Sequence, residues 1–208
     1  AADDIARYTS PDPFSGLADK ALMASQIRDL QLYYPEDISP DELAQLAIRA
    51  ETAALDADPR INNSDGASAN AHTAVKVFGN SHGFLNGYCS SRYSLSCSVI
   101  GEDSEGNMQR DYDYTIARKF SEMLAPETVG LKTAEKTVSR LGARKIATTR
   151  LPILLAPDIA TGLIGHFIGA ISGGSLYRKS SFLLDSINTQ IFPDWFNIEE
   201  QPHLLGAL

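Results

Sequence analysis

The sequence predicts an α+β protein in which an antiparallel sheet is flanked by helices and followed by the start of a second, C-terminal unit. Two observations carry this prediction. Apolar residues recur at helical spacing after Ser39, and apolar and polar residues alternate over residues 92–99 and again over residues 108–116. A hydrophobic content of 43% and a charged content of 21% are typical of a globular chain that can bury a core.

The first expected helix follows an irregular N-terminal region. Residues 1–36 contain helix-breaking prolines and one amphipathic stretch at 17–32. Ser39 is then followed by Pro40 and, three residues after Ser39, by Glu42, which is the pattern of a capping box with proline at the first helical position. We therefore expect a helix from residue 40 to about residue 56.

Residues 60–120 predict a meander of antiparallel strands. The dipeptide Asp65-Gly66 indicates a hairpin, and residues 72–78 are β-rich. The clearest strand places Tyr93, Leu95, Cys97 and Val99 on an apolar face. After a turn at 103–107, residues 108–116 alternate again and are expected to pair with it as a half-exposed strand.

A second helix is expected at residues 127–141, with Pro126 at its start and Gly142 at its C-terminal cap. Its apolar face is expected to comprise Leu131, Ala134, Val138 and Leu141. The predicted organisation is a linker region at 1–37, a central α+β domain at 38–147 and the beginning of a C-terminal domain at 148–208.

The C-terminal unit is expected to open with a short buried strand at 151–155 and an apolar helix that starts at Pro157, with Asp158 near the positive end of its dipole. Four glycines share one side of this helix, which predicts close approach of another backbone and burial on both sides. They are Gly162, Gly165, Gly169 and Gly173. A further helix at 180–188 and a strand at 190–198 would make this unit β-rich. Because the chain stops directly after that segment, we expect it to be the central fragment of a longer protein.

Charge and apolar patterning exclude several partners. The net charge of −8 and the absence of a long basic run argue against direct nucleic-acid binding. The longest apolar run, around residues 159–171, is too short to span a bilayer, so no membrane association is expected. Two cysteines in a chain of this size fit a reducing cytoplasm.

Catalytic chemistry is not evident from motifs. No nucleophile elbow, phosphate loop or HExxH pattern occurs, and no catalytic or substrate-binding residue is assigned. His166 is the only candidate metal ligand, against the alternative of a buried, hydrogen-bonded structural role. The serines at 90–98 are interpreted as a solvated strand face, Asp111 and Asp113 as an exposed acidic face or a pair sharing a cation, and Cys89 and Cys97 as core thiols.

Several blocks together resemble the PmbA (TldE) branch of the TldD/PmbA family, whose members are described as modulators of DNA gyrase and classed with metallopeptidases. The blocks are DPRINNSDGASAN (58–70), NSHGFLNGYCSSRYSLSCSVIGED (80–103), MQRDYDY (108–114), LIGHFIGAISGGSLYRKSSFLLDS (163–186) and FPDWFNIEEQPHL (192–204).

This resemblance implies a specific loss of function. In the TldD branch, the helix after the apolar strand carries His-Glu-x-x-x-His, in which the histidines hold zinc and the glutamate is the general base. His166 matches the first histidine, whereas Phe167 and Ile171 occupy the places of the glutamate and the second histidine. The resemblance therefore implies no metal and no cofactor in this chain, with zinc in a TldD-type partner.

The functional expectation is a non-catalytic subunit of a cytosolic heterodimeric metallopeptidase that acts on small or unfolded peptides. Its partners would be a TldD-like homologous subunit and peptide substrates, and the isolated chain could form homo-oligomers. Two alternatives stay open at this point. One is a binding regulator of gyrase-linked toxin-antitoxin or microcin systems without proteolysis, and the other is a zinc peptidase in its own right.

Overall fold

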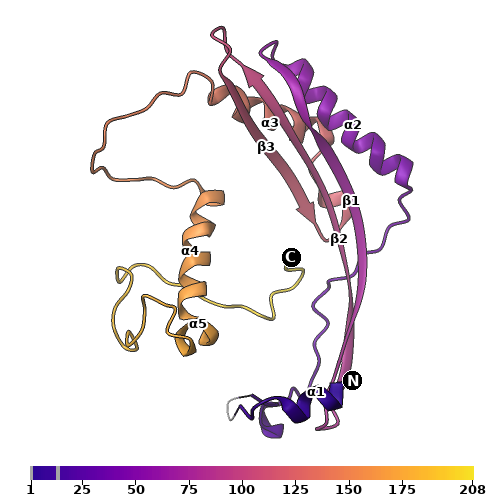
Figure 1. Cartoon of the computed structure of the whole chain (residues 1–208). Helices are drawn as coiled ribbons and strands as arrows, with labels where there is room; N and C mark the ends of the chain where they lie inside the picture. Colours follow the sequence, from indigo (N-terminus) through magenta and orange to yellow (C-terminus); the bar gives the residue numbers. More distant parts are fainter. Residues whose placement is uncertain (1, 13–14) are drawn as a thin grey trace. The chain divides into compact units, whose positions relative to one another are not determined.

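The computed structural model describes residues 2–12 and 15–208. The chain divides into two compact units, which are described separately below. The larger unit comprises Ala1–Ala143 with Pro202–Leu208, and the smaller unit comprises Arg144–Gln201 (Figure 1).

The larger unit is built on a three-stranded antiparallel sheet of order β1-β2-β3. Strand β1 runs from Ile61 to Gly79, β2 from Leu85 to Glu102 and β3 from Met108 to Ala117. β3 pairs only with residues 93–102 of β2, whereas β1 pairs with β2 along nearly its whole length. Residues 85–92 of β2 therefore pair with β1 alone. This part of the sheet is a two-stranded ribbon, which extends past the helices in Figure 1. The predicted α+β architecture with an antiparallel sheet and flanking helices is confirmed.

The predicted hairpin at Asp65-Gly66 is wrong. The strand continues through this dipeptide, and the pairing register shifts between Ser64 and Gly66, so the extra residue forms a β-bulge. Gly66 has φ +105°, a conformation that suits a glycine in a bulge as well as in a hairpin turn. The reversal lies instead at residues 80–84, where the Asn80 side chain accepts hydrogen bonds from the N–H groups of His82 and Phe84.

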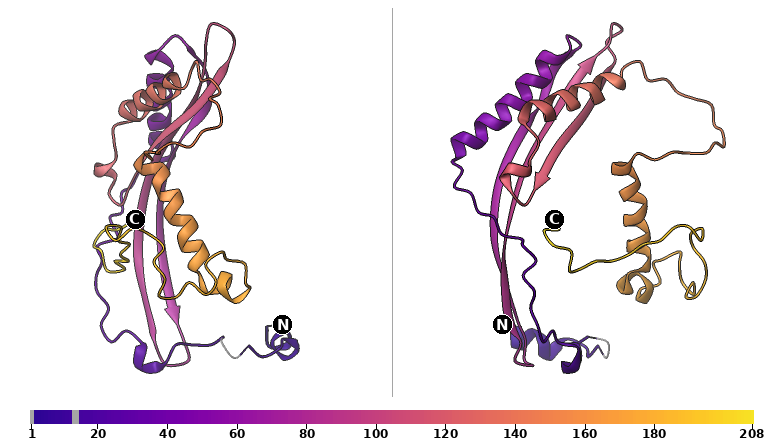
Figure 2. Two further views of the ribbon diagram at one scale, coloured as in Figure 1. Left: turned by 90° about the vertical axis from the view of Figure 1, so that its left-hand side faces the viewer. Right: turned by 180° about the vertical axis from the view of Figure 1, so that it is seen from behind.

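Helices α2 (Pro40–Ala57) and α3 (Pro126–Ser139) cover one face of the sheet (Figure 2). At the start of α2, Ser39 Oγ accepts a hydrogen bond from Glu42 N–H and the Glu42 carboxylate accepts one from Ser39 N–H, so the predicted capping box is confirmed. The apolar face of β2 is also confirmed, since Tyr93, Leu95, Cys97 and Val99 are all buried.

The contact between α2 and α3 depends on small side chains. Gly130 of α3 lies directly against the carbonyl group of Ala50, and a Cβ atom at Gly130 would stand 3.0 Å from both Ala53 Cβ and Ala54 N. The buried face of α3 consists of Val129, Gly130, Thr133, Ala134 and Thr137. The predicted face was wrong at Leu131, which is 53% exposed, because the small residues bring a different side of the helix against α2 and the sheet.

The N-terminal region of this unit departs from expectation. Beyond α1 (Ala2–Tyr8), the amphipathic stretch at 17–32 forms only a short 3-10 turn, η1 (Lys20–Leu22), rather than a helix. A second 3-10 turn, η2 (Phe120–Glu122), follows β3. Residues 32–36 have no regular secondary structure, and backbone groups among them bond to β2, for example Leu32 C=O, which accepts from Ser91 N–H at 2.9 Å.

The smaller unit is organised around α4 (Pro157–Ile171), which is followed by α5 (Gly173–Tyr177). The helix, its initial proline and Asp158 in its first turn confirm the prediction. The side chains beside α4 form an aromatic cluster, in which the ring centroids of Phe167 and Phe192 lie 5.0 Å apart and those of Phe192 and Phe196 lie 4.6 Å apart.

The other expectations for this unit were wrong. Its described residues contain no strand: residues 151–155 and 190–198 are irregular, and residues 180–188 form turns. Leu154 is 99% exposed, and only Ala170 of α4 is buried. A strand requires a hydrogen-bonded neighbour, and this unit supplies none. A Cβ atom at Gly162, Gly165, Gly169 or Gly173 would meet nothing within 4 Å, so no backbone of the described chain approaches them.

None of the helices in the part of the chain that the structure describes combines the length and apolar character needed to cross a bilayer.

Candidate functional site

The candidate metal ligand, His166, lies on α4 and is exposed, so the expected buried structural role is wrong. The residue after it, Phe167, turns into the aromatic cluster, and Ile171 ends the helix. Neither side chain can bind a metal or accept a proton. Among residues 2–12 and 15–208, no group of three or more His, Cys, Asp or Glu side chains could hold a metal ion. The side chains that α4 presents at these three positions therefore do not fit a zinc site of the His-Glu-x-x-x-His type.

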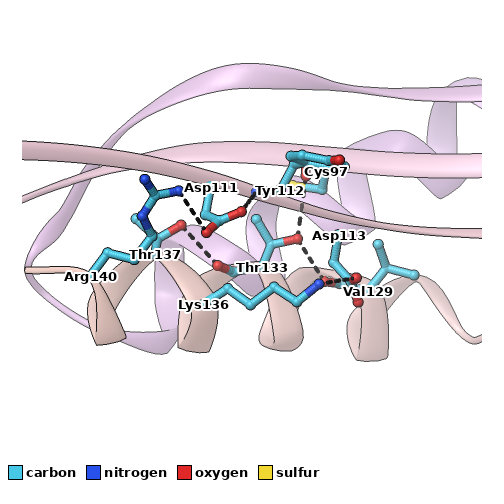
Figure 3. A network of polar contacts seen from close by, with 9 residues as sticks. All are labelled: Cys97, Asp111, Tyr112, Asp113, Val129, Thr133, Lys136, Thr137 and Arg140. Atoms are coloured by element: carbon cyan, nitrogen blue, oxygen red, sulfur yellow. Dashed lines mark hydrogen bonds and ion pairs between the residues drawn. The ribbon is translucent and has the colours of Figure 1, made fainter. Parts of the chain in front are cut away.

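Asp111 and Asp113 lie between β3 and α3 and not on an exposed acidic face, which corrects the sequence interpretation (Figure 3). Each carboxylate pairs with its own cation: Asp113 with Lys136 at 2.8 Å and Asp111 with Arg140 at 3.1 Å. The two aspartate side chains are only 13% and 20% exposed, respectively. Strand β3 thus turns its carboxylates toward α3 and its aromatic residues Tyr112 and Tyr114 toward the open face of the sheet. We interpret the two ion pairs as attachments between helix and sheet.

The serine and cysteine predictions hold only in part. Ser91 is buried, although the serines of β2 were interpreted as solvated, because its hydroxyl accepts a hydrogen bond from Tyr34 N–H and donates one to Arg118 C=O. Cys97 is a core thiol as expected, whereas Cys89 is exposed. Burial raises the pKa of the Cys97 thiol to about 11.

These environments predict selective thiol chemistry. At pH 8 the Cys97 thiol is protonated and shielded, since its raised pKa lies far above the solution pH, whereas Cys89 is accessible. Iodoacetamide should therefore modify one thiol per native chain, located at Cys89 by peptide mass spectrometry, and two in denaturant. Rapid native modification of Cys97 would contradict the described core.

A groove with a volume of about 1490 Å³ lies beside the two-stranded ribbon of the larger unit. The N-terminal segment, the ribbon and the C-terminal residues all contribute to its lining. The lining residues are Ala24, residues 26–34, residues 75–78, Phe84, residues 86–89, residues 202–204 and Ala207. We define these residues as the ribbon groove.

A small set of buried polar groups holds the walls of the ribbon groove in place. The Tyr93 hydroxyl donates a hydrogen bond to Tyr34 C=O at 2.9 Å and accepts one from Glu36 N–H at 2.8 Å. Arg118 donates from Nε and Nη2 to Ala207 C=O and from Nη1 to Ser91 C=O. Tyr93 and Arg118 thus attach the N-terminal segment and the C-terminal residues to β2.

Sequence reasoning did not find Tyr93 and Arg118 as organising residues. Tyr93 was assigned only to an apolar face, although a buried tyrosine hydroxyl needs a polar partner and signals a connection to another segment. Arg118 had no signal, because its acceptor lies 89 residues away along the chain. The ribbon groove itself joins three segments that sequence spacing cannot place together.

The family model for the PmbA/TldA metallopeptidase central domain matches residues 33–141, and that for the PmbA/TldA metallopeptidase C-terminal domain matches residues 148–208. The chain belongs to the PmbA/TldA metallopeptidase family. The two matched domains together account for most of the chain and include α4 and the sheet.

Curated relatives support the same assignment. The chain is 59% identical to Metalloprotease PmbA of Escherichia coli O157:H7 over 208 residues, which is 100% of this chain and 46% of that protein. It is 58% identical to a Metalloprotease PmbA homolog of Haemophilus influenzae, with the same coverage of both chains. The chain therefore spans about half the length of the curated PmbA relatives that it matches.

Solved structures share the fold. A Bacteroides thetaiotaomicron protein described as a candidate modulator of DNA gyrase superposes with a TM-score of 0.90 at 26% identity, over 98% of this chain and 47% of that one. TldE from Thermococcus kodakarensis superposes with a TM-score of 0.59 at 16% identity, over 88% and 41%, which shows the fold alone.

Proposed function

We propose that this chain is a non-catalytic PmbA/TldE-like subunit of a cytosolic, two-chain TldD/PmbA peptidase system that processes small or unfolded peptides. The observation that carries the proposal is the composition of α4. His166 stands there with Phe167 and Ile171 in place of the base and the second nitrogen donor of the TldD-type pattern.

Zinc-dependent hydrolysis of a peptide bond requires a metal site and a base. A catalytic zinc site in proteins has three protein ligands and an open position for water, and a carboxylate or imidazole must move the proton of that water. One exposed imidazole beside a phenyl ring supplies neither the ligand number nor the base. In this proposal the zinc and the base belong to a TldD-like partner, and this chain contributes binding surface.

The test begins with the metal content of the isolated chain. We expect elemental analysis to find much less than one zinc per chain, and the His166→Ala variant to contain the same amount. One full equivalent that disappears in His166→Ala would overturn the proposal and identify the chain as a zinc peptidase in its own right.

The second step adds a TldD-type chain. We expect a heterodimer in size-exclusion chromatography with light scattering, together with chelator-sensitive hydrolysis of an unfolded test peptide. Addition of His166→Ala in place of the wild-type chain should preserve that hydrolysis, because no ligand is lost. A mixture that binds the peptide without cleaving it would contradict the peptidase assignment and favour a binding regulator.

A further inference from the structure

The inference concerns the dipeptide Asn86-Gly87 in the two-stranded ribbon. The Gly87 N–H donates a hydrogen bond to Oδ1 of the preceding Asn86 side chain at 2.6 Å. This contact places the Gly87 nitrogen beside Cγ of the Asn86 amide group, with which it can close a five-membered ring. A nucleophile held this close to its carbonyl carbon is already near the geometry of attack.

The position of Gly87 in the sheet keeps its N–H outside the β1–β2 ladder. Alternate residues of an antiparallel strand direct their backbone groups to the same side. Ser91 N–H points away from β1 to Leu32 C=O at 2.9 Å, and the pairing register is unbroken from Ser91 to Gly87. Gly87 N–H therefore points away from β1 too, whereas the Asn86 backbone faces Phe78 across the ladder. The ladder thus fixes the asparagine without engaging the nitrogen that would attack it.

Glycine is required at this position by the pairing of the two strands. A Cβ atom at Gly87 would stand 2.6 Å from the carbonyl oxygen of Lys76 and 3.1 Å from Val77 Cγ2. Glycine also hinders ring closure least, because it has no Cβ atom beside the attacking nitrogen. The residue that close strand pairing demands is therefore the one that makes Asn86 reactive.

The chain contains one Asn-Gly and one Asp-Gly dipeptide, and the second is held differently. Gly66 N–H donates to Ser64 Oγ at 2.9 Å, and Arg110 Nη1 donates to the Asp65 carboxylate at 2.8 Å. Both reacting groups of Asp65-Gly66 are thus engaged by other residues. The side-chain contact does recur at Asn63, whose Oδ1 accepts from Ser64 N–H at 2.9 Å, but serine has a Cβ atom beside that nitrogen.

We propose that Asn86-Gly87 is a site of spontaneous covalent modification, at which Asn86 deamidates through a cyclic imide. The Gly87 nitrogen loses its proton to solvent and bonds to Asn86 Cγ, and the side-chain nitrogen takes up a proton and leaves as ammonia. Water then opens the ring at either carbonyl group, which yields aspartate or isoaspartate. The net reaction consumes one water and releases one ammonia, without oxidation or reduction.

The products change the ribbon groove, because Asn86 and Gly87 both line it. Aspartate at this position adds a carboxylate on the ribbon face that it shares with Lys76, a diagonal neighbour across the β1–β2 pair. Isoaspartate inserts a carbon atom into the backbone of β2, so the pairs between it and the turn lose their register. The modification therefore alters both the charge of the groove and the end of the ribbon.

The experiment incubates the whole chain at mildly alkaline pH beside synthetic peptides of residues 61–76 and 77–92, which serve as unfolded references. Liquid chromatography with tandem mass spectrometry of tryptic digests follows each site. Asn86 should deamidate in the native chain at least as fast as in its peptide, because the fold holds the reacting atoms together. Asp65 should isomerise about tenfold more slowly in the native chain than in its peptide, or slower still, because that reaction needs local opening of β1.

A pair of glutamine variants isolates the reacting side chain. Asn86→Gln keeps the amide group but lengthens the side chain, so that the ring would need six members, and it should slow the reaction at this position by about tenfold or more. Asn70→Gln is the same substitution at an exposed position of β1 and is the matched control. It should leave the deamidation rate of Asn86 unchanged.

Three outcomes would overturn the inference. Deamidation of Asn86 much more slowly in the native chain than in its peptide would show that the strand holds the nitrogen away from the amide group. An equal slowing of Asn86 and Asp65 relative to their peptides would show that both react only in unfolded chains. Deamidation of Asn63 as fast as that of Asn86 in the native chain would remove the role of Gly87.

Discussion

Replacement of Gly130 by alanine is expected to destabilise the larger unit by about 2–3 kcal/mol, since overpacking a close contact costs about this much or more. The added methyl group would overlap the carbonyl oxygen of Ala50 and press against Ala53 and Ala54. These are backbone and Cβ atoms, which cannot rotate away as the end of a long side chain can. Helices α2 and α3 would have to separate, and the core beneath them would open.

The matched control is Gly165→Ala on α4. It is the same substitution inside a helix, but its Cβ atom would meet nothing within 4 Å. There the change should stabilise the helix by up to about 1 kcal/mol, because alanine has the better helix propensity. Hydrogen exchange of β2 amides reports the larger unit, and exchange of α4 amides reports the smaller one. Equal effects of the two variants would show that the α2–α3 contact is looser than described.

The second large effect is expected at Tyr93, which is 1% exposed and packs edge-on against Phe120 with ring centroids 5.7 Å apart. Tyr93→Ala should destabilise the larger unit by about 3–5 kcal/mol, as is usual for removal of a buried ring. Tyr93→Phe keeps the ring but leaves Tyr34 C=O and Glu36 N–H without their partner, which should cost about 1–3 kcal/mol. Urea unfolding followed by exchange of β2 amides measures both.

Comparison of the two Tyr93 variants also separates the loss of core packing from the loss of the hydrogen bonds that position the N-terminal wall of the ribbon groove. In Tyr93→Phe, the amides of Tyr34 and Glu36 should exchange faster than core amides do, because only the attachment of the N-terminal segment is lost. Tyr112→Ala, on the open face of the same sheet and 58% exposed, is the control and should cost less than about 1 kcal/mol. A Tyr93→Phe variant indistinguishable from wild type would contradict the role of the hydroxyl.

Local patterns predicted the elements whose evidence lies within a few residues. The capping box at Ser39, the alternation from Tyr93 to Val99 and the proline that begins α4 each act over one turn or one strand pair, so the sequence alone located them. Where one local signal serves two structures, prediction failed: Asp65-Gly66 fits a hairpin turn and a bulge equally well. The lack of a His-Glu-x-x-x-His pattern at His166, where Phe167 and Ile171 stand, was readable from sequence for the same reason, because it is a matter of residue type at fixed spacing.

Contacts between residues that are far apart in the sequence decided the remaining features of the structure. The sequence by itself determined that the chain is an α+β member of its family without the TldD-type zinc pattern on α4. Only the tertiary structure decided that Asp111 and Asp113 face α3, that Gly130 has a close backbone contact whereas Gly162, Gly165, Gly169 and Gly173 have none, and that Tyr93 and Arg118 hold the walls of the ribbon groove. The physical reason is that charge pairing, close packing and hydrogen bonding act between neighbours in space, whereas sequence periodicity reports only which side of its own element a residue occupies.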